Sequence, residues 1–216
     1  MSMSDRLKKT IAIWRRQKVK IIGVVGKRKA GKDVFVDCVM KNYRGLRHVR
    51  IADAPLLIAK ILYLPADRRV YHALFGVNAL LYPILKESAF KRRAAIILDR
   101  EKPHQVIVEA LRTKEEYREF IVKRKGILIA IAAADDIRYQ RALKDAKQQG
   151  EKRDEGKMTF REFMAKEASP IEREIAYIMK KAHSTIRNDY KTHRPFHQKI
   201  REALAPLGLK KKYRKW

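Results

Sequence analysis

One short segment constrains the fold of this chain more than any other part of the sequence. Residues 19–25 (VKIIGVV) form a β-branched and almost continuous apolar run, which is typical of a strand buried on both faces in a parallel sheet. The run leads directly into the pattern Gly26-x-x-x-x-Gly31-Lys32, and residues 33–42 then have the character of a helix. A buried strand, a glycine-rich loop and a helix in this order predict an α/β fold.

The loop between this strand and this helix indicates a phosphate-binding loop, or P-loop. Glycines allow the backbone to wrap closely around a phosphate, with its N–H groups pointing inward at the positive end of a helix dipole. The lysine would reach the outer phosphates of a nucleoside triphosphate, either ATP or GTP. We therefore expect eight consecutive residues to bind the nucleotide: Gly26, Lys27, Arg28, Lys29, Ala30, Gly31, Lys32 and Asp33.

The last residue of the loop departs from the usual motif. Asp33 stands where a Ser or Thr hydroxyl commonly binds Mg²⁺, and its carboxylate can bind that ion through a water molecule. The alternative is a degenerate loop that holds a phosphate or an RNA backbone without catalysis. Lys27, Arg28 and Lys29 add positive charge at the loop, which favours both interpretations.

The rest of the chain alternates strand patterns with helix patterns. Apolar residues at helical spacing predict helices at residues 135–149 and 195–205. The pairs Thr113/Glu116 and Thr159/Glu162 predict capping boxes at the starts of two further helices. Such alternation favours a single domain with the P-loop NTPase fold, in which helices flank a parallel sheet. Further strands are expected at residues 48–52, 104–111, 126–134 and 184–189.

The distribution of charged residues and glycines along the chain suggests the domain boundaries. Residues 1–18 are expected to form a basic helix that is an appendage before the core, and residues 209–216 form a basic tail. The P-loop domain would occupy residues 19–208. Within it, a charged, glycine-containing stretch predicts a lid at about residues 143–158.

The loop and the stretches that follow it resemble those of known families. The loop followed by Val34 and Phe35 resembles the P-loop of animal phosphomevalonate kinases and of some deoxynucleoside monophosphate kinases, where Asp also replaces Ser or Thr. Residues 20–190 are similar in order and spacing to kinases of the nucleoside monophosphate and dephospho-CoA types. The corresponding stretches are VEALR at 108–112, IRYQR at 137–141, TFREF at 159–163, IERE at 171–174 and IRND at 186–189.

The resemblance implies transfer of the γ-phosphoryl group of ATP to a small acceptor, such as a nucleotide or dephospho-CoA, with Mg²⁺ present. Positive groups would stabilise the charge on the moving phosphoryl group, and the candidates are Lys32 with Arg138, Arg141 and Arg153 of the lid. The alternative for each arginine is a solvated surface charge. Glu109, at the end of a buried strand, is the candidate for ordering Mg²⁺ or the acceptor.

The same resemblance has departures on the acceptor side. Glu109 and Ala110 replace the Asp and Gly of the family, and Leu57 stands where an Arg is frequent. These changes affect the expected acceptor site more than the expected triphosphate site.

The net charge of +28, from 52 Lys and Arg against 24 Asp and Glu, predicts a polyanionic partner. A second hypothesis is therefore a protein of the same fold that is bound to RNA, as a ribosome-associated or ribosomal protein, with catalysis reduced or lost. The alternative to this hypothesis is a generally basic proteome with a solvated tail. Aromatic residues between the charges of the tail would stack on bases, so the candidate RNA-binding residues are Lys210, Lys211, Lys212, Tyr213, Arg214, Lys215 and Trp216.

Three further features restrict the class of protein. The single cysteine, Cys38, excludes an intrachain disulfide and a multi-cysteine zinc site. No apolar run has the roughly 18 residues that a membrane span needs, so we expect no membrane partner and a cytoplasmic protein, with an organelle matrix as the alternative. His193 and His197 are four residues apart, but their basic neighbours disfavour a metal site.

Overall fold

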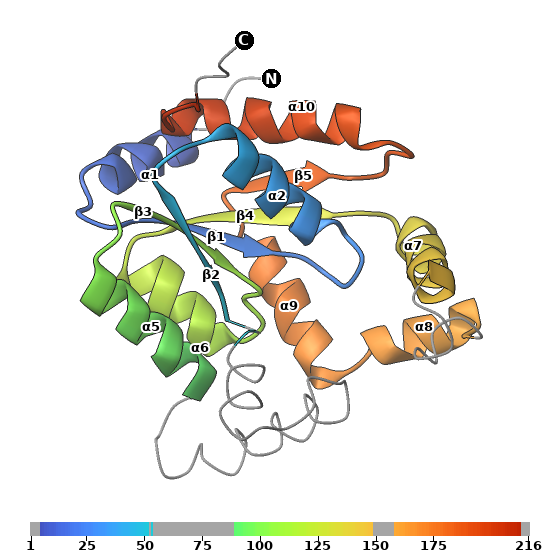
Figure 1. Cartoon of the computed structure of the whole chain (residues 1–216). Helices are drawn as coiled ribbons and strands as arrows, with labels where there is room; N and C mark the ends of the chain where they lie inside the picture. Colours follow the sequence, from blue (N-terminus) through green and yellow to red (C-terminus); the bar gives the residue numbers. More distant parts are fainter. Residues whose placement is uncertain (1–4, 52, 54–88, 149–157, 213–216) are drawn as a thin grey trace.

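The computed structural model describes residues 5–51, 53, 89–148 and 158–212 (Figure 1). Its centre is a five-stranded sheet in the order β2-β3-β1-β4-β5, and every pairing within it is parallel. The predicted α/β fold with a parallel sheet is therefore confirmed. The strands are β1 (Lys20–Val25), β2 (Leu46–Arg50), β3 (Gln105–Glu109), β4 (Ile127–Ala132) and β5 (Ser184–Arg187).

The two faces of the sheet carry separate hydrophobic clusters. Side chains alternate along each strand, so Ile22 and Val24 of β1 belong to one cluster while Ile21 and Val25 belong to the other. β1 is buried along almost its whole length because it has a neighbour on each side and helices on both faces. This double burial explains why its sequence is a continuous apolar run rather than an alternating one.

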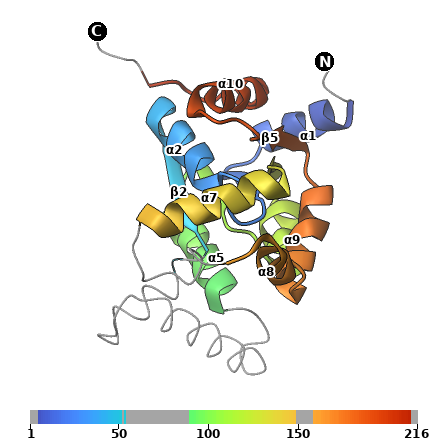
Figure 2. The same cartoon turned by 90° about the vertical axis from the view of Figure 1, so that its right-hand side faces the viewer.

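Helices cover both faces of the sheet. Figure 1 shows α1, α2 and α10 on one face and α5, α6 and α9 on the other, while Figure 2 shows α7 and α8 in front of the sheet when it is seen from the loop side. Their bounds are α1 (Asp5–Arg15), α2 (Lys32–Asn42), α5 (Ala89–Glu101), α6 (Lys114–Tyr117), α7 (Asp135–Gln148), α8 (Phe160–Glu167), α9 (Pro170–Lys180) and α10 (His193–Leu204). A π-helical turn, Arg118–Lys123, follows α6, and a 3₁₀ turn, Ala205–Leu207, follows α10.

Local signals in the sequence locate several of these elements correctly. Both predicted capping boxes are present, since the Thr113 and Thr159 side chains accept hydrogen bonds from the backbone N–H groups of Glu116 and Glu162. The strand expected at residues 48–52 begins earlier, at Leu46. Residues 143–148 of the expected lid belong to α7, and residues 149–157 lie outside the described part of the chain, as do residues 54–88.

The N-terminal helix is not the appendage that the sequence predicts. Trp14 is only 1% exposed, and its indole Nε1 donates a hydrogen bond to the carbonyl oxygen of Ile21 at 2.8 Å. Ile11, one turn earlier, is also buried in the cluster that α2 and α10 share. The apolar stripe of α1 therefore completes the core beside β1, while Lys8, Lys9 and Arg15 are exposed.

The beginning of the C-terminal tail also contacts the domain. The backbone N–H of Lys212 donates to the Asn42 carbonyl oxygen at 2.8 Å, and the Lys212 ammonium donates to the Met40 carbonyl oxygen at 2.7 Å. Residues 210–212 thus lie against the C-terminal end of α2. Residues 213–216 are outside the described part. Across the described ranges, none of the helices is both long and apolar enough to cross a membrane.

We expect Trp14→Ala to reduce the free energy of unfolding by about 3–5 kcal/mol, because it leaves a cavity and an unpaired Ile21 carbonyl. Ile13→Ala is the matched control, since Ile13 lies on the same helix and is 49% exposed. Urea unfolding of both variants measures the difference. An equally small loss in the two variants would mean that α1 is not part of the core.

Candidate functional site

The glycine-rich loop lies at the carboxyl end of the central strand β1. The strand order reverses around β1, which is the point where open parallel sheets leave a crevice for ligands. Gly31 precedes α2 with φ 100° and ψ 30°, a left-handed conformation that favours glycine, and α2 has no side-chain cap. Because the first N–H groups of a helix have no acceptor within it, the uncapped start of α2 can donate to an anion in the loop.

Both glycines of the motif are also required by close packing. A Cβ atom on Gly26 would lie 2.4 Å from the carbonyl oxygen of Ile131, and one on Gly31 would lie 2.2 Å from Asn188 Nδ2. Asn188 is buried and donates a hydrogen bond to the Ala30 carbonyl oxygen at 2.9 Å. Strands β4 and β5 therefore support the loop from behind, and substitution of either glycine would displace it.

Lys32 folds back across the loop. Its ammonium Nζ donates to the carbonyl oxygens of Gly26 at 2.8 Å and Lys27 at 2.9 Å. Burial lowers the pKa of Lys32 to about 8, although the neighbouring carboxylate of Asp33 acts in the opposite direction. The ammonium thus lies on the inner side of the loop, where it carries a charge that a phosphate would stabilise.

The two described arginine candidates both hold the loop backbone. Arg138 is completely buried, and its guanidinium donates to the Arg28 carbonyl oxygen at 3.1 Å. Arg141 donates to three carbonyl oxygens, those of Lys29 at 3.3 Å, Asn188 at 2.8 Å and Tyr190 at 3.1 Å. Their role toward a moving phosphoryl group stays a prediction, and Arg153 lies outside the described residues.

Helices α7 and α8 also bind the basic side chains of the loop. Lys27 lies 3.3 Å from Glu167 of α8, and Lys29 forms an ion pair with Asp145 of α7. Arg28 places its guanidinium over the ring of Phe163, 5.5 Å from the centroid. The positive charge that the sequence shows at residues 27–29 is therefore directed toward these two helices and partly compensated by them.

Glu167 is the residue that joins these contacts. One of its carboxylate oxygens lies 3.0 Å from Arg138 Nη1, and the two side chains are 6% and 1% exposed. Arg138 also pairs with Asp135 at 2.6 Å. No sequence pattern indicated Glu167, because its partners Arg138 and Lys27 lie about 30 and 140 residues away along the chain.

An acidic group lies beside the loop, at the ends of β2 and β3. The Glu109 side chain is 2% exposed, and its Oε2 is 2.9 Å from His48 Nε2. Burial acts to raise the pKa of Glu109, but the His48 hydrogen bond and the nearby Arg50 hold it below its ordinary value. The other oxygen, Oε1, is buried and has no hydrogen-bond partner within the described part of the chain.

The P-loop kinase fold implies Mg²⁺, and the residues at this end of the sheet fit that ion. Mg²⁺ is commonly held by one or two carboxylates together with substrate phosphates and water. Asp33 and Glu109 are two such carboxylates, and Glu109 Oε1 is an unsatisfied oxygen. Among the described residues no cluster of three or more His, Cys, Asp or Glu could hold a metal by itself. The rings of His193 and His197 stack on each other, and no third residue of these types joins them among the described residues.

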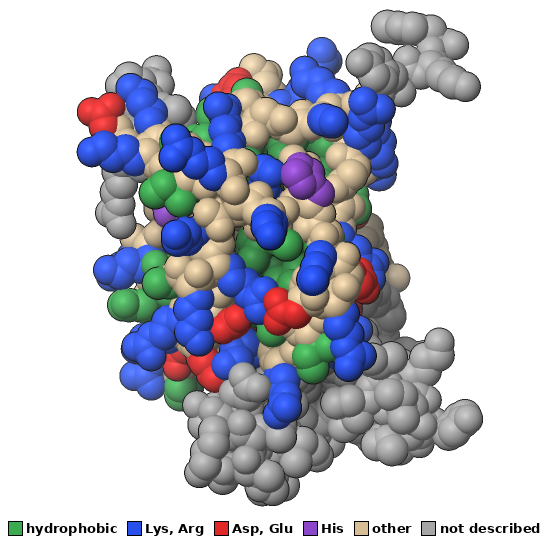
Figure 3. All heavy atoms as spheres, turned by 90° about the vertical axis from the view of Figure 1, so that its left-hand side faces the viewer, with side chains coloured by type: hydrophobic (Ala, Val, Ile, Leu, Met, Phe, Trp, Pro, Cys, Tyr) green, Lys and Arg blue, Asp and Glu red, His purple; other side chains and the backbone are tan. Residues whose placement is uncertain are grey.

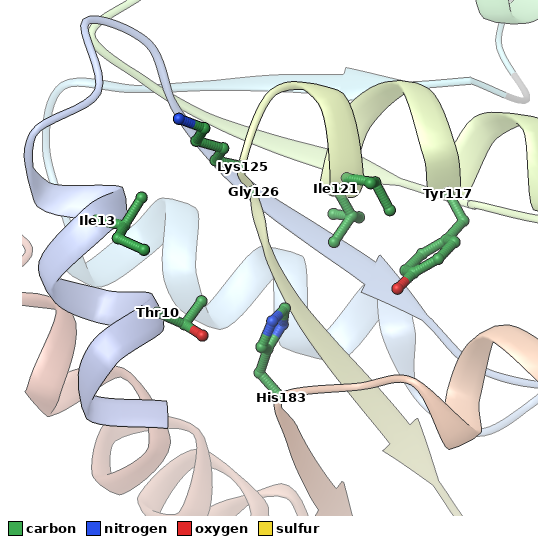
Figure 4. Close-up of a pocket in the computed structure, with 8 residues that line it drawn as sticks. Thr10, Ile13, Tyr117, Ile121, Lys125, Gly126 and His183 are labelled. Carbon is green, nitrogen blue, oxygen red and sulfur yellow. The ribbon is translucent and has the colours of Figure 1, made fainter. Parts of the chain in front are cut away.

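A cavity at the amino ends of β4 and β5 is separate from this site (Figure 4). Gly126 and His183, which precede β4 and β5, line it together with Ile13 of α1 and Tyr117 of α6. His183 Nδ1 accepts a hydrogen bond from the Leu128 N–H at 2.9 Å. Because the loop follows β1 whereas these residues precede their strands, the cavity is not part of the phosphate site.

Comparison with known proteins agrees with this geometry. The sequence matches no known family and no curated protein. Among solved structures, it is similar to a shikimate kinase from Bacteroides thetaiotaomicron, with a TM-score of 0.55, 17% identity and coverage of 88% of this chain and 99% of that chain. TT1252 from Thermus thermophilus matches with a TM-score of 0.53, 14% identity and coverage of 86% and 96%.

The chain therefore has the fold of the P-loop kinases, with five parallel strands in the order 2-3-1-4-5 and helices on both faces. A dephospho-CoA kinase from Campylobacter jejuni also matches over 88% of this chain and 98% of that chain, at 19% identity. Its TM-score is 0.44.

We expect Glu167→Gln to lower the free energy of unfolding by about 3 kcal/mol, because it removes one partner of the buried Arg138 guanidinium. Glu202→Gln is the control, since Glu202 forms an ion pair with Lys199 in which both side chains are about half exposed. Its urea midpoint should not change. Equal midpoints for the two variants would show that the negative charge of Glu167 does not stabilise the folded chain.

Proposed function

We propose that this protein is a nucleotide-dependent phosphotransferase of the P-loop small-molecule kinase type. One observation carries the proposal: Lys32 Nζ lies across a glycine loop that ends at the uncapped start of α2. A lysine ammonium and the N–H groups of a helix start form a site that suits the phosphates of ATP or GTP. The fold shared with a shikimate kinase supports the same class of activity.

Phosphoryl transfer needs positioning and positive charge more than covalent chemistry. In the proposed mechanism the N–H groups of the loop hold the phosphates. Lys32 stabilises the negative charge on the outer phosphate oxygens during transfer. Asp33 and Glu109 would hold Mg²⁺, which when bound supplies further positive charge at the phosphates. Arg138 and Arg141 keep the loop in shape, and we propose the phosphoryl group as a second partner for Arg141.

The acceptor is a small phosphorylated or hydroxyl compound, of the nucleotide or dephospho-CoA type. Glu109 lies where it can orient that acceptor, because it ends β3 beside the loop and keeps one carboxylate oxygen without a hydrogen-bond partner among the described residues. The alternative role of Glu109 is to hold Mg²⁺, and the same carboxylate would serve either role.

We expect Lys32→Ala to weaken ATP binding by roughly 10- to 100-fold, the size of a lost charge-assisted hydrogen bond. Isothermal titration calorimetry measures the affinity, with Lys199→Ala as a control because Lys199 is exposed and pairs with Glu202 on α10. Unchanged ATP affinity in Lys32→Ala would contradict the proposal.

The pH profile identifies the charge involved. Since burial lowers the pKa of Lys32 in the free protein to about 8, affinity should be highest where the amine is protonated, near pH 7 and below, and fall as the pH rises through 8. The neutral amine that forms above this pH attracts the triphosphate less. Lys32→Arg should remove the pH dependence, because Arg stays protonated over the same range.

A second candidate function is binding to RNA, which we propose on the basis of the charge distribution. Figure 3 shows a face on which Lys and Arg side chains clearly outnumber Asp and Glu. The docked start of the tail adds to this charge beside basic residues of α2, α10 and the turn after α2. All of them are exposed: Lys41, Arg44, Arg201, Lys210, Lys211 and Lys212.

We expect the triple substitution of Lys210, Lys211 and Lys212 by Gln to weaken RNA binding and to flatten its dependence on salt. Each lost phosphate contact should reduce the logarithmic salt slope by about 0.7 to 0.9, because fewer counterions are released. Fluorescence anisotropy with a structured RNA at several salt concentrations measures the slope. ATP affinity is the control and should not change, since these lysines lie at the end of α2 away from the loop. An unchanged slope would contradict the RNA hypothesis.

A further inference from the structure

Arg50 holds a position between the two carboxylates of the candidate magnesium site. Its Nη2 lies 3.4 Å from Asp33 Oδ1, and its Nε lies 3.8 Å from Glu109 Oε2. One guanidinium is therefore within 4 Å of both carboxylates. No role for Arg50 follows from the loop motif, which ends 17 residues earlier.

The register of the sheet explains this position. Arg50 of β2 pairs directly with Glu109 of β3, and paired residues of parallel strands point to the same face. The first turn of α2 lies on that face and presents Asp33. Residues from three elements thus meet at the carboxyl end of the sheet, next to the loop.

The chemistry of this cluster is unusual for a nucleotide site. Two carboxylates beside a triphosphate would repel it unless a cation lies between them. The guanidinium supplies a positive charge at the point where both carboxylates converge. Glu109 keeps Oε1 buried without a hydrogen-bond partner among the described residues, so the guanidinium satisfies the cluster only in part.

We infer that Arg50 acts as an internal counter-cation that competes with a divalent metal ion for Asp33 and Glu109. This inference rests on the proposed nucleotide-binding function and extends it to regulation by metal concentration. In the metal-free protein the single positive charge of Arg50 compensates part of the negative charge of the two carboxylates. When Mg²⁺ binds them, Arg50 moves away.

The structure also contains a third carboxylate that the displaced guanidinium can contact. Asp53 Oδ1 lies 4.0 Å from Arg50 Nε, and the Arg50 side chain is 42% exposed. A side chain that is open to solvent on one side and has a third carboxylate nearby can move at a small cost. Arg50 therefore differs from the buried Arg138, which has no such freedom.

The test compares metal binding in Arg50→Gln and wild type. Mn²⁺ replaces Mg²⁺ as a probe, and electron paramagnetic resonance measures free Mn²⁺ in titrations of the nucleotide-free protein. We expect Arg50→Gln to bind Mn²⁺ roughly 5- to 50-fold more tightly, the range of coupling between two linked binding events. Asp33→Asn in the Arg50→Gln background should remove most of this gain.

The matched control is Arg47→Gln on the same strand. Arg47 points to the opposite side of β2, where its Nε lies 2.9 Å from Glu101 Oε2, and the substitution removes the same charge. Its Mn²⁺ affinity should equal that of wild type. Arg50→Lys provides a second variant, which keeps a cation and should show an intermediate affinity if Arg50→Gln does not fold.

Nucleotide binding separates this inference from the proposed function. ATP titrations in EDTA should show weaker binding by Arg50→Gln than by wild type, and the difference should disappear at saturating Mg²⁺. Equal Mn²⁺ affinity in wild type and Arg50→Gln would overturn the counter-cation role. Absence of ATP binding by wild type would instead overturn the proposed function, while the Mn²⁺ titrations would still decide the role of Arg50.

Discussion

The buried ion pair between Arg138 and Glu167 is the interaction on which the candidate site depends. The guanidinium of Arg138 contacts three parts of the structure: Glu167 of α8, Asp135 of its own helix α7, and the Arg28 carbonyl oxygen of the loop. A charge that is taken out of water must keep all of its partners, because the loss of one leaves it uncompensated. The shape of a glycine-rich loop, which is flexible by composition, is in this way fixed by helices from a distant part of the chain.

Around this support the charges are arranged on two sides of the loop. Basic side chains at residues 27–29 turn toward α7 and α8, where Glu167 compensates Lys27 and Asp145 compensates Lys29, while Arg28 lies over the Phe163 ring. Carboxylates gather on the other side, at the ends of β2 and β3, where Arg50 compensates them. Lys32 lies between the two sides. The net charge of +28 therefore does not describe the local field, because several charges beside the loop, those of Lys27, Lys29, Asp33 and Glu109, have specific partners of the opposite sign.

Sequence patterns predicted those parts of the molecule that depend on local interactions. The apolar runs of β1 and β4 and the capping boxes at Thr113 and Thr159 are determined by neighbours within a few residues, and the structure confirms them. Glu167, Asn188 and Arg50 were missed, since their contacts join residues that are far apart in sequence and only the fold brings them together. The helical pattern around Trp14 was recognised, but no periodicity indicates which surface the apolar stripe will cover.

Arg141 binds main-chain atoms alone at the three contacts that place it beside the loop, the carbonyl oxygens of Lys29, Asn188 and Tyr190. Every residue type has such an oxygen, so this clamp does not depend on the side chains at the positions it holds. The three Arg141 hydrogen bonds can therefore persist when the side chains at positions 29 and 190 change, although a change at position 29 also removes the ion pair of Lys29 with Asp145. Chains with little sequence in common could keep this geometry, and the loop could change its ligand preference while its scaffold stays the same.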